Sequence, residues 1–284
     1  MKVAAVIALK AEHRLDLLLQ IAGLARSTFF YHQARLARPD PRAELKTAIT
    51  AVFENSHRRY GHRRVHAVLT RQGWRVAKKT VLKLMRRLGL HCPVRRKKRY
   101  NSHRGETGRT APNLLNRDFT ATAPNQKWVT DVTEFRVGDR KLYLSPVMDL
   151  FDHQIIAYTI GNSPNLALTN NSLREAVATL EPGQAPLVHS DQGFQYQHPT
   201  WQRLLADAGA TQSMSRKANC YDNAVIENWF GHLKEELFNH NRYASVDALA
   251  EALHNYVGWY NNHRISTQLE GLSPVHYRTQ TLAA

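Results

Sequence analysis

Three acidic residues stand where a carboxylate is costly unless something compensates its charge. Asp131 lies inside an apolar stretch with strand character, Asp191 ends a second such stretch, and Glu227 sits on a helical stretch that starts near Tyr221. A buried carboxylate needs an ion pair or a bound cation. A lone aspartate at a strand end is commonly a turn cap, and a lone glutamate on a helix is commonly a surface residue. Together, with 59 residues between the aspartates and 35 between Asp191 and Glu227, they favour a site that holds metal ions for phosphodiester chemistry.

The helix that carries Glu227 has two distinct stripes. Residues 225, 226, 229, 230, 233 and 237 are apolar at helical spacing and form the expected buried stripe. Asn223, Glu227 and Lys234 follow at i, i+4 and i+11, so we expect them to face one site. There Lys234 would bind a DNA phosphate or pair with a nearby acid, and Asn223 would contact DNA.

The region around the two aspartates has the pattern of an α/β domain. Strands are expected over residues 128–135, 141–150, 154–160, 186–191 and 211–215, with a hairpin turn at Gly138-Asp139 and helices over 166–180 and 200–208. This βββαβαβα order predicts a mixed five-stranded sheet flanked by helices. A tail follows, with Ser245 capping a helix through Tyr256 and Pro274 ending the last element.

The charge of the chain is distributed very unevenly. Residues 1–118 hold 27 lysines and arginines against 7 acids, whereas residues 119–284 hold 12 against 16. Such a front half is typical of a polyanion-binding region. Apolar stretches fall far short of the roughly 18 residues that a membrane span needs. The two cysteines, Cys92 and Cys220, exclude a disulfide framework, and we expect a cytoplasmic protein.

Helices with a basic outer face fill the front half. Residues 12–34 read as helix, glycine turn at Gly23 and second helix capped by Ser27, which fits a helix-turn-helix or a plain helical hairpin equally well. Three helices are expected between residues 42 and 90, ending at Phe53, Gly73 and Gly89, as an all-α helix-turn-helix region. We expect DNA contacts from basic residues of these helices and of the segment behind them: Arg63, Arg64, Lys78, Lys79, Lys83, Arg86, Arg87, Arg95, Arg96, Lys97, Lys98 and Arg99. His62 and His66 are spaced like a helical metal pair, but the single thiol nearby argues against zinc.

These patterns divide the chain into five parts. We expect an N-terminal helical segment (1–38), a helix-turn-helix domain (39–92), a basic linker (93–118), a catalytic core (119–240) and a helical C-terminal tail (241–284).

Several motifs resemble those of one protein family over about residues 20–278. The chain is similar to the integrase-like transposases of bacterial insertion sequences, in the insertion-sequence-three family, through segments 60–64, 124–133, 189–196, 213–217, 222–224 with Glu227, and 260–261. The resemblance implies a ribonuclease-H-like core shared with retroviral integrases, in which Asp131, Asp191 and Glu227 are the catalytic and metal-binding residues and Lys234 is the family's basic residue. It implies cleavage of the element's 3′-ends and their transfer to other DNA, a nucleoid location, and a homo-oligomer on the DNA. Family transposases resemble a fusion with an upstream frame, and this chain resembles the downstream part, so the upstream product is an expected partner.

The expected chemistry uses two Mg²⁺ ions, for which Mn²⁺ can substitute, because oxygen ligands suit these hard cations. Two other functions are compatible with the same residues. One is a DNA-binding regulator with an inactive core, and the other is a nuclease that cuts DNA without joining it.

Overall fold

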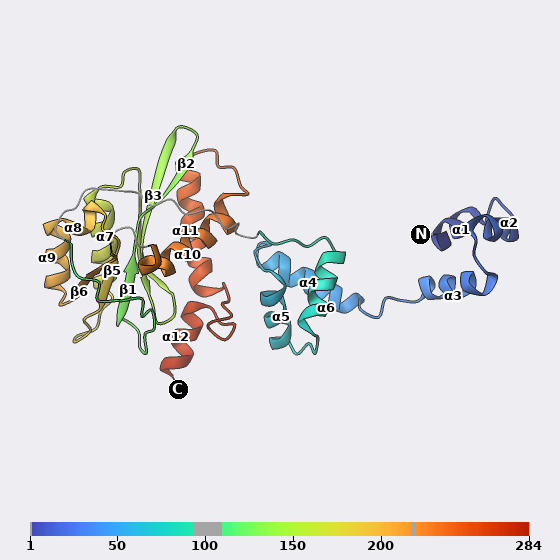
Figure 1. The fold of residues 1–284 in the computed structure, drawn as a ribbon, viewed down its shortest axis with the longest axis horizontal. Helices are drawn as coiled ribbons and strands as arrows, with labels where there is room; N and C mark the ends of the chain where they lie inside the picture. The colour runs from blue at the N-terminus through green and yellow to red at the C-terminus, as the bar shows by residue number, and fades with distance from the viewer. Residues whose placement is uncertain (1, 94–109, 217–219, 284) are drawn as a thin grey trace.

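The computed structural model describes residues 2–93, 110–216 and 220–283, which fold as two helical clusters followed by a larger α/β body (Figure 1). The basic run Arg95–Arg99 lies outside the described residues.

The first helical cluster contains α1 (Lys2–Leu9), α2 (Leu15–Ala22) and α3 (Arg26–Ala37), packed around Phe29. Gly23 ends α2 in the left-handed conformation, with φ of 61°, as expected. The expected cap at Ser27 is wrong, because α3 already begins at Arg26 and its cap position is Ala25, which offers no side-chain acceptor. Helix α1 was not expected from the sequence.

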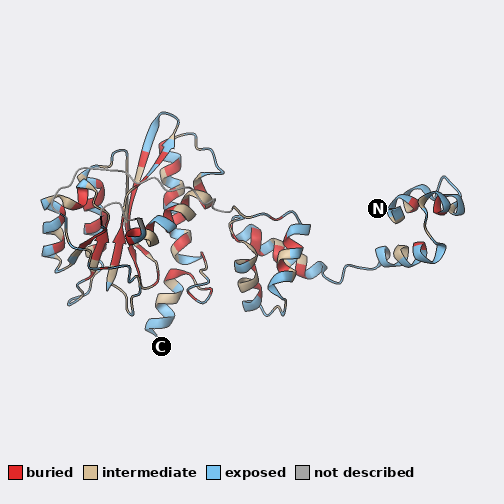
Figure 2. Cartoon of the chain, in the orientation of Figure 1, coloured by how far each residue is buried: buried red, intermediate tan, exposed pale blue. Residues whose placement is uncertain are grey.

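The second cluster is the predicted three-helix region. Its helices are α4 (Ala43–Asn55), α5 (His62–Arg71) and α6 (Lys78–Arg87). Their apolar sides meet in one cluster that includes Ile49, Phe53, Val65, Leu69 and Val81. The order of buried and exposed positions follows the amphipathic pattern of the sequence (Figure 2).

The α/β body is built on a mixed sheet. Its strands are β1 (Lys127–Thr130), β2 (Thr133–Val137), β3 (Arg140–Asp149), β4 (Ile155–Gly161), β5 (Leu187–Ser190) and β6 (Thr211–Met214). Strand β3 pairs with β4 on one edge and with β1 and β2 on the other, all antiparallel, while β5 lies parallel to β1 and β6 parallel to β5. This confirms the predicted α/β fold class, a mixed sheet flanked by helices.

The sheet has one more strand than the five predicted, because the stretch around Asp131 is interrupted. Strand β1 ends at Thr130 and β2 starts at Thr133, and both pair with β3 in sequence. The carboxylate of Asp131 accepts a hydrogen bond from the N–H of Val132 at 2.7 Å, a local bond made at the break in the ladder.

Helices cover both faces of the sheet. One face packs on α7 (Leu166–Val177) and α9 (Pro199–Asp207) through Trp128 and Val188. A short helix, α8 (Phe194–Gln197), precedes α9 and was not expected. The other face packs on α10 (Ala224–Leu233) and α11 (Val246–Asn262). The parts of the chain that the structure describes contain no helix long and apolar enough to cross a membrane.

The C-terminal region packs on this body. Ser245 caps α11 as predicted, by accepting a hydrogen bond from the N–H of Ala248. The expectation that Pro274 ends the last element is wrong: it occupies the first turn of α12 (Pro274–Leu282), where proline is tolerated because its missing N–H would be unsatisfied anyway. Arg278 of α12 forms ion pairs with the buried Asp149 and Asp152.

Candidate active site

The parallel pairing of β1 and β5 brings the two aspartates together. Lys127 is aligned with Leu187, and Val129 with His189, which is an offset of sixty residues. Asp131 and Asp191 keep this offset, and each follows the last residue of its strand. Neighbouring strands lie about 4.8 Å apart, so the two carboxylates extend side by side from the carboxyl ends of adjacent strands. That edge is where α/β sheets generally bind ligands.

The helix α10 carries Glu227 one turn from its start, and buried polar groups fix that start. The amide of Asn223 donates to the carbonyl oxygen of Thr130 at 3.5 Å, which links α10 to the strand that leads to Asp131. Asn223 is only 2% exposed, so its side chain holds these two elements together and does not lie on the surface.

The electrostatics of Asp131 show that the three acids share one environment. Burial raises the pKa of Asp131 well above its usual value, the negative charge of Asp191 raises it further, and Glu227 adds a smaller increase. The N–H of Val132 and the charge of Lys234 act in the opposite direction. We refer to Asp131, Asp191 and Glu227 below as the carboxylate triad.

Asp191 is held in a tight loop. Burial raises the pKa of Asp191, and the N–H of Gly193, 2.9 Å from its Oδ1, lowers it. A Cβ on Gly193 would lie 3.0 Å from that same oxygen, so only glycine leaves the carboxylate in this position without displacement. Behind it, His189 bridges the hydroxyls of Ser213 and Ser215, and burial lowers its pKa to about 4, which keeps the ring neutral.

Lys234 lies where α10 gives way to a π-helical turn, Lys234–Phe238. Its ammonium group lies 5.4 Å from the centre of the Phe135 ring, and its charge acts on Asp131. The sequence predicts one helix from about Tyr221 to Leu237. The structure divides this stretch into a 3₁₀ turn (Cys220–Asn223), α10 and the π-helical turn. π-Helical turns often occur at functional sites.

The triad does not form a closed metal site in this conformation. Asp131 and Asp191 are half-buried, and Glu227 is exposed. Among the described residues, no group of three histidine, cysteine, aspartate or glutamate side chains is arranged to hold a metal ion. The donor set nevertheless fits a hard divalent cation, because all three groups offer carboxylate oxygens and the repulsion that raises the pKa of Asp131 would be relieved by positive charge.

The structure does not place all the DNA-contact residues predicted in the front half of the chain on one exposed surface. Arg63 and the five basic residues of α6 are exposed: Lys78, Lys79, Lys83, Arg86 and Arg87. Arg64, next to Arg63 in sequence, instead points to the α/β body and pairs with Glu236 at 3.2 Å. The run Arg95–Arg99 lies outside the described residues.

Sequence reasoning gave no role to two buried acids near α10. Asp222 is fully buried and accepts hydrogen bonds from Arg117, Arg216 and Asn113, and these arginines hold its pKa well below the usual range. Glu236 is 8% exposed, and the sequence assigned it no role. The signal for Asp222 was its place in a recognised motif, whereas Glu236 carried no local signal because its partners are remote in sequence.

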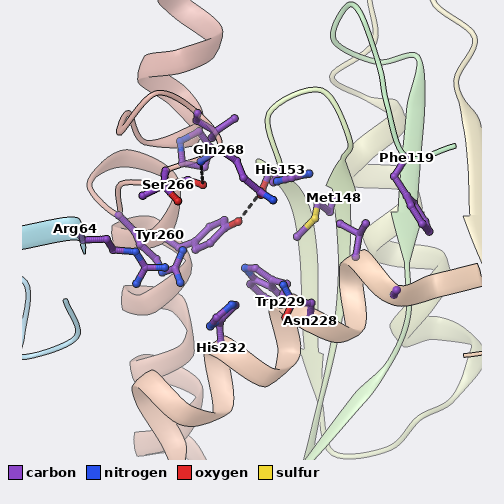
Figure 3. Close-up of a pocket in the computed structure, with 16 residues that line it drawn as sticks. Arg64, Phe119, Met148, His153, Asn228, Trp229, His232, Tyr260, Ser266 and Gln268 are labelled. Atoms are coloured by element: carbon purple, nitrogen blue, oxygen red, sulfur yellow. Dashed lines mark hydrogen bonds between the residues drawn. The ribbon is translucent and has the colours of Figure 1, made fainter. Parts of the chain in front are cut away.

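A cavity of about 540 Å³ lies beside α10, between this helix and the segment 264–274 (Figure 3). Trp229, His232 and Asn228 line it from α10, and Tyr260 lines it from α11. Arg64 reaches its edge from α5, so the cavity lies where the second helical cluster meets the α/β body.

Family models match three segments of the chain. An HTH-like domain matches residues 40–98, and an integrase core domain matches residues 121–220, with a second integrase core description for residues 227–282.

Curated relatives match over most of the length. InsK of Escherichia coli K12, named as a transposase of insertion sequence element IS150, is 47% identical over 96% of both chains. InsF of the same organism, a transposase for insertion sequence IS3A, is 31% identical over 96% of this chain and 97% of its own. A Shigella flexneri protein named as a transposase for IS1353 is 42% identical, over 90% of this chain but 50% of its own length.

Solved structures match less closely. A chain of the simian T-cell lymphotropic virus intasome structure is 19% identical with a TM-score of 0.41, over 76% of this chain and 68% of its own. The HTLV-2 integrase catalytic core domain in complex with magnesium is 16% identical with a TM-score of 0.40, over 55% of this chain and 98% of its own.

Proposed function

Because the chain belongs to the insertion-sequence-three family of transposases, which are polynucleotidyl transferases, we propose that the carboxylate triad cuts the 3′-ends of its element and joins them to other DNA. The observation that carries this assignment is the offset of sixty residues between β1 and β5, which sets Asp131 beside Asp191. The effect of Glu227 on the pKa of Asp131 supports including the glutamate.

The triad would hold two Mg²⁺ or Mn²⁺ ions. When bound, such ions supply Lewis-acid stabilisation of the leaving 3′-oxygen and activate the attacking hydroxyl. Asp131 and Asp191 are already side by side, so they would provide the shared ligands. Glu227 is exposed on α10 and would complete the set as the third carboxylate ligand.

The basic residues would bind the DNA and not the metal ions. Lys234 would contact a phosphate of the DNA end close to the triad, because its charge already acts on Asp131. The exposed basic face of α6 would bind duplex DNA, with lysines and arginines reaching phosphates or base edges. Binding to DNA would place the protein at the bacterial nucleoid.

The proposed function also implies protein partners. An insertion sequence has two ends, so we propose that at least two copies of the chain assemble on the DNA. The chain spans half the length of the IS1353 relative, which is consistent with an upstream product as a further partner.

The experiment that tests this function uses a pre-cut element-end duplex with a free 3′-hydroxyl, a plasmid target and Mg²⁺ or Mn²⁺. We expect joined product from the wild type and none from Asp131→Asn, which should still bind DNA. The matched control is Asp139→Asn, an exposed aspartate in the turn between β2 and β3, which should join normally.

The same assay separates the alternatives. Cleavage of an uncut end without any joined product would identify a nuclease, and DNA binding without either reaction would identify a regulator. Full activity of Asp131→Asn would reject the assignment of the triad.

A further inference from the structure

Glu236 joins three segments that are far apart in sequence. Its carboxylate accepts hydrogen bonds from Arg264 at 2.7 and 2.8 Å, from the hydroxyl of Tyr256 at 2.9 Å, and from Arg64 of α5 at 3.2 Å. The π-helical turn, α11 with the segment behind it, and the helix-turn-helix domain therefore meet at one side chain.

This ion-pair network is buried. The side chains of Glu236 and Arg264 are 5% and 6% exposed, and that of Arg64 is 21% exposed. Burial by itself would raise the pKa of Glu236, but the two arginines lower it to about 2. The carboxylate is thus ionised at neutral pH and bound on both sides by permanent cations.

Further contacts extend the interface between the helix-turn-helix domain and the α/β body. The guanidinium of Arg59 lies 4.5 Å from the ring centre of Trp259 and donates to the carbonyl oxygen of Glu236 at 3.2 Å. The hydroxyl of Tyr60 donates to the carbonyl oxygen of His263 at 3.0 Å. Both hydrogen bonds are accepted by main-chain carbonyl oxygens, so they fix the orientation of the helix-turn-helix domain on the α/β body.

Glu236 also belongs to the catalytic helix. It is two residues past Lys234 and nine past Glu227, within the π-helical turn that continues α10. The N–H of Asn239 donates to the carbonyl oxygen of Lys234 at 2.7 Å, the wide i to i+5 bond of such a turn. The hydrogen bonds and ion pairs that hold Glu236, called the clamp below, therefore fix the position of the preceding turn, which carries Lys234.

We propose that Glu236 is a positioning residue of the transposase: by binding Arg64 it fixes the end of the catalytic helix to the helix-turn-helix domain. DNA held on the basic face of α6 then reaches the carboxylate triad in one orientation. This inference rests on the proposed function, because it concerns how bound DNA is presented to that site. It assigns Arg64 to the domain interface, whereas Arg63 remains on the exposed face.

The adjacent arginines provide a matched pair of variants in the full-length chain. Arg64→Ala should bind an element-end duplex with an affinity within about twofold of the wild type. At saturating DNA it should join the duplex about tenfold to a hundredfold more slowly, because displacing the reacting groups by roughly 1 Å can reduce the rate of a positioned reaction by such a factor. Arg64→Lys should recover part of the rate, since it keeps a cation near Glu236. Arg63→Ala should do the reverse, with weaker and less salt-dependent binding but a near-normal rate at saturation.

Two results would overturn the proposal: an Arg64→Ala protein that loses affinity as Arg63→Ala does while joining normally at saturation, or one that joins at the wild-type rate throughout. If Arg64→Ala does not fold, Arg71→Ala replaces it. Arg71 donates to the carbonyl oxygens of Gly271 and Glu270 at 2.7 and 3.0 Å on the same interface, and an unchanged rate at saturation would reject the role of domain orientation.

Calorimetry separates this inference from the proposed function. The helix-turn-helix domain and the α/β body should unfold in one transition in the wild type and in two transitions in Arg64→Ala. If the wild type yields no joined product, the proposed function fails, and the calorimetric split still supports the clamp. If the wild type yields no joined product and Arg64→Ala also unfolds in a single transition, the clamp is rejected as well.

Discussion

Replacing Glu236 by glutamine keeps the size of the side chain and removes the charge on which two arginines depend. The pKa of Glu236 is lowered from 4.5 to about 2, which corresponds to roughly 3 kcal/mol of stabilisation at neutral pH. Because the side chain is only 5% exposed, solvent does little to screen this interaction. Breaking a buried ion pair on one side typically costs about 3–5 kcal/mol, so the two figures agree.

The pH dependence of this stabilisation has a definite sign. A carboxyl group with a lowered folded-state pKa stabilises the protein above its unfolded pKa, and this contribution disappears as the pH falls through the folded pKa. For Glu236 the contribution is complete above about pH 5 and is lost between about pH 4.5 and pH 2. The glutamine variant has no such titration, so the difference between the two proteins should shrink over this interval.

Urea unfolding followed by tryptophan fluorescence measures this difference, since Trp259 lies at the interface. We expect Glu236→Gln to lower the free energy of unfolding by about 3 kcal/mol near pH 7. The control is Glu251→Gln, an exposed glutamate on α11, which should change it by less than about 0.5 kcal/mol. A glutamine variant at position 236 within about 1 kcal/mol of the wild type would refute the reasoning.

Three other predictions concern the site and the DNA surface. Asp131→Asn should raise the melting temperature of the metal-free protein, because it removes one of two adjacent negative charges, and it should abolish any further stabilisation by Mg²⁺. A lower melting temperature would contradict the raised pKa of Asp131. Lys79→Ala and Lys83→Ala should each reduce the slope of log K against log salt concentration for DNA binding by about one unit, as measured by fluorescence anisotropy between low and moderate salt. An unchanged slope would show that the lysine does not contact a phosphate. Asp222→Asn should lower the free energy of unfolding in urea by only about 1–2 kcal/mol, since its arginine partners are half exposed and solvent screens the ion pairs. It should also slow joining by displacing the start of α10, and a normal joining rate would limit its role to stability.

Local sequence pattern predicted much of the fold. The alternation and length of the apolar stretches predicted β3, β4 and β6. The glycine signal predicted the C-terminal end of α2, and the serine signal predicted the start of α11. Two of the failures have a local cause. The strand around Asp131 breaks where its own carboxylate bonds to the backbone, and Pro274 begins a helix because proline suits a first turn.

The sequence by itself determined which residues are acidic, apolar or basic and at what spacing. This sufficed to propose the triad and to predict the basic face of α6, because side-chain chemistry and periodicity are local properties. Only the tertiary structure decided that Arg64 differs from Arg63, that Asn223 is buried, and that Glu236 is held by two arginines. These roles depend on contacts between residues that are up to 172 positions apart. Such contacts follow from how the helix-turn-helix domain and the α/β body pack, and no local pattern encodes that packing.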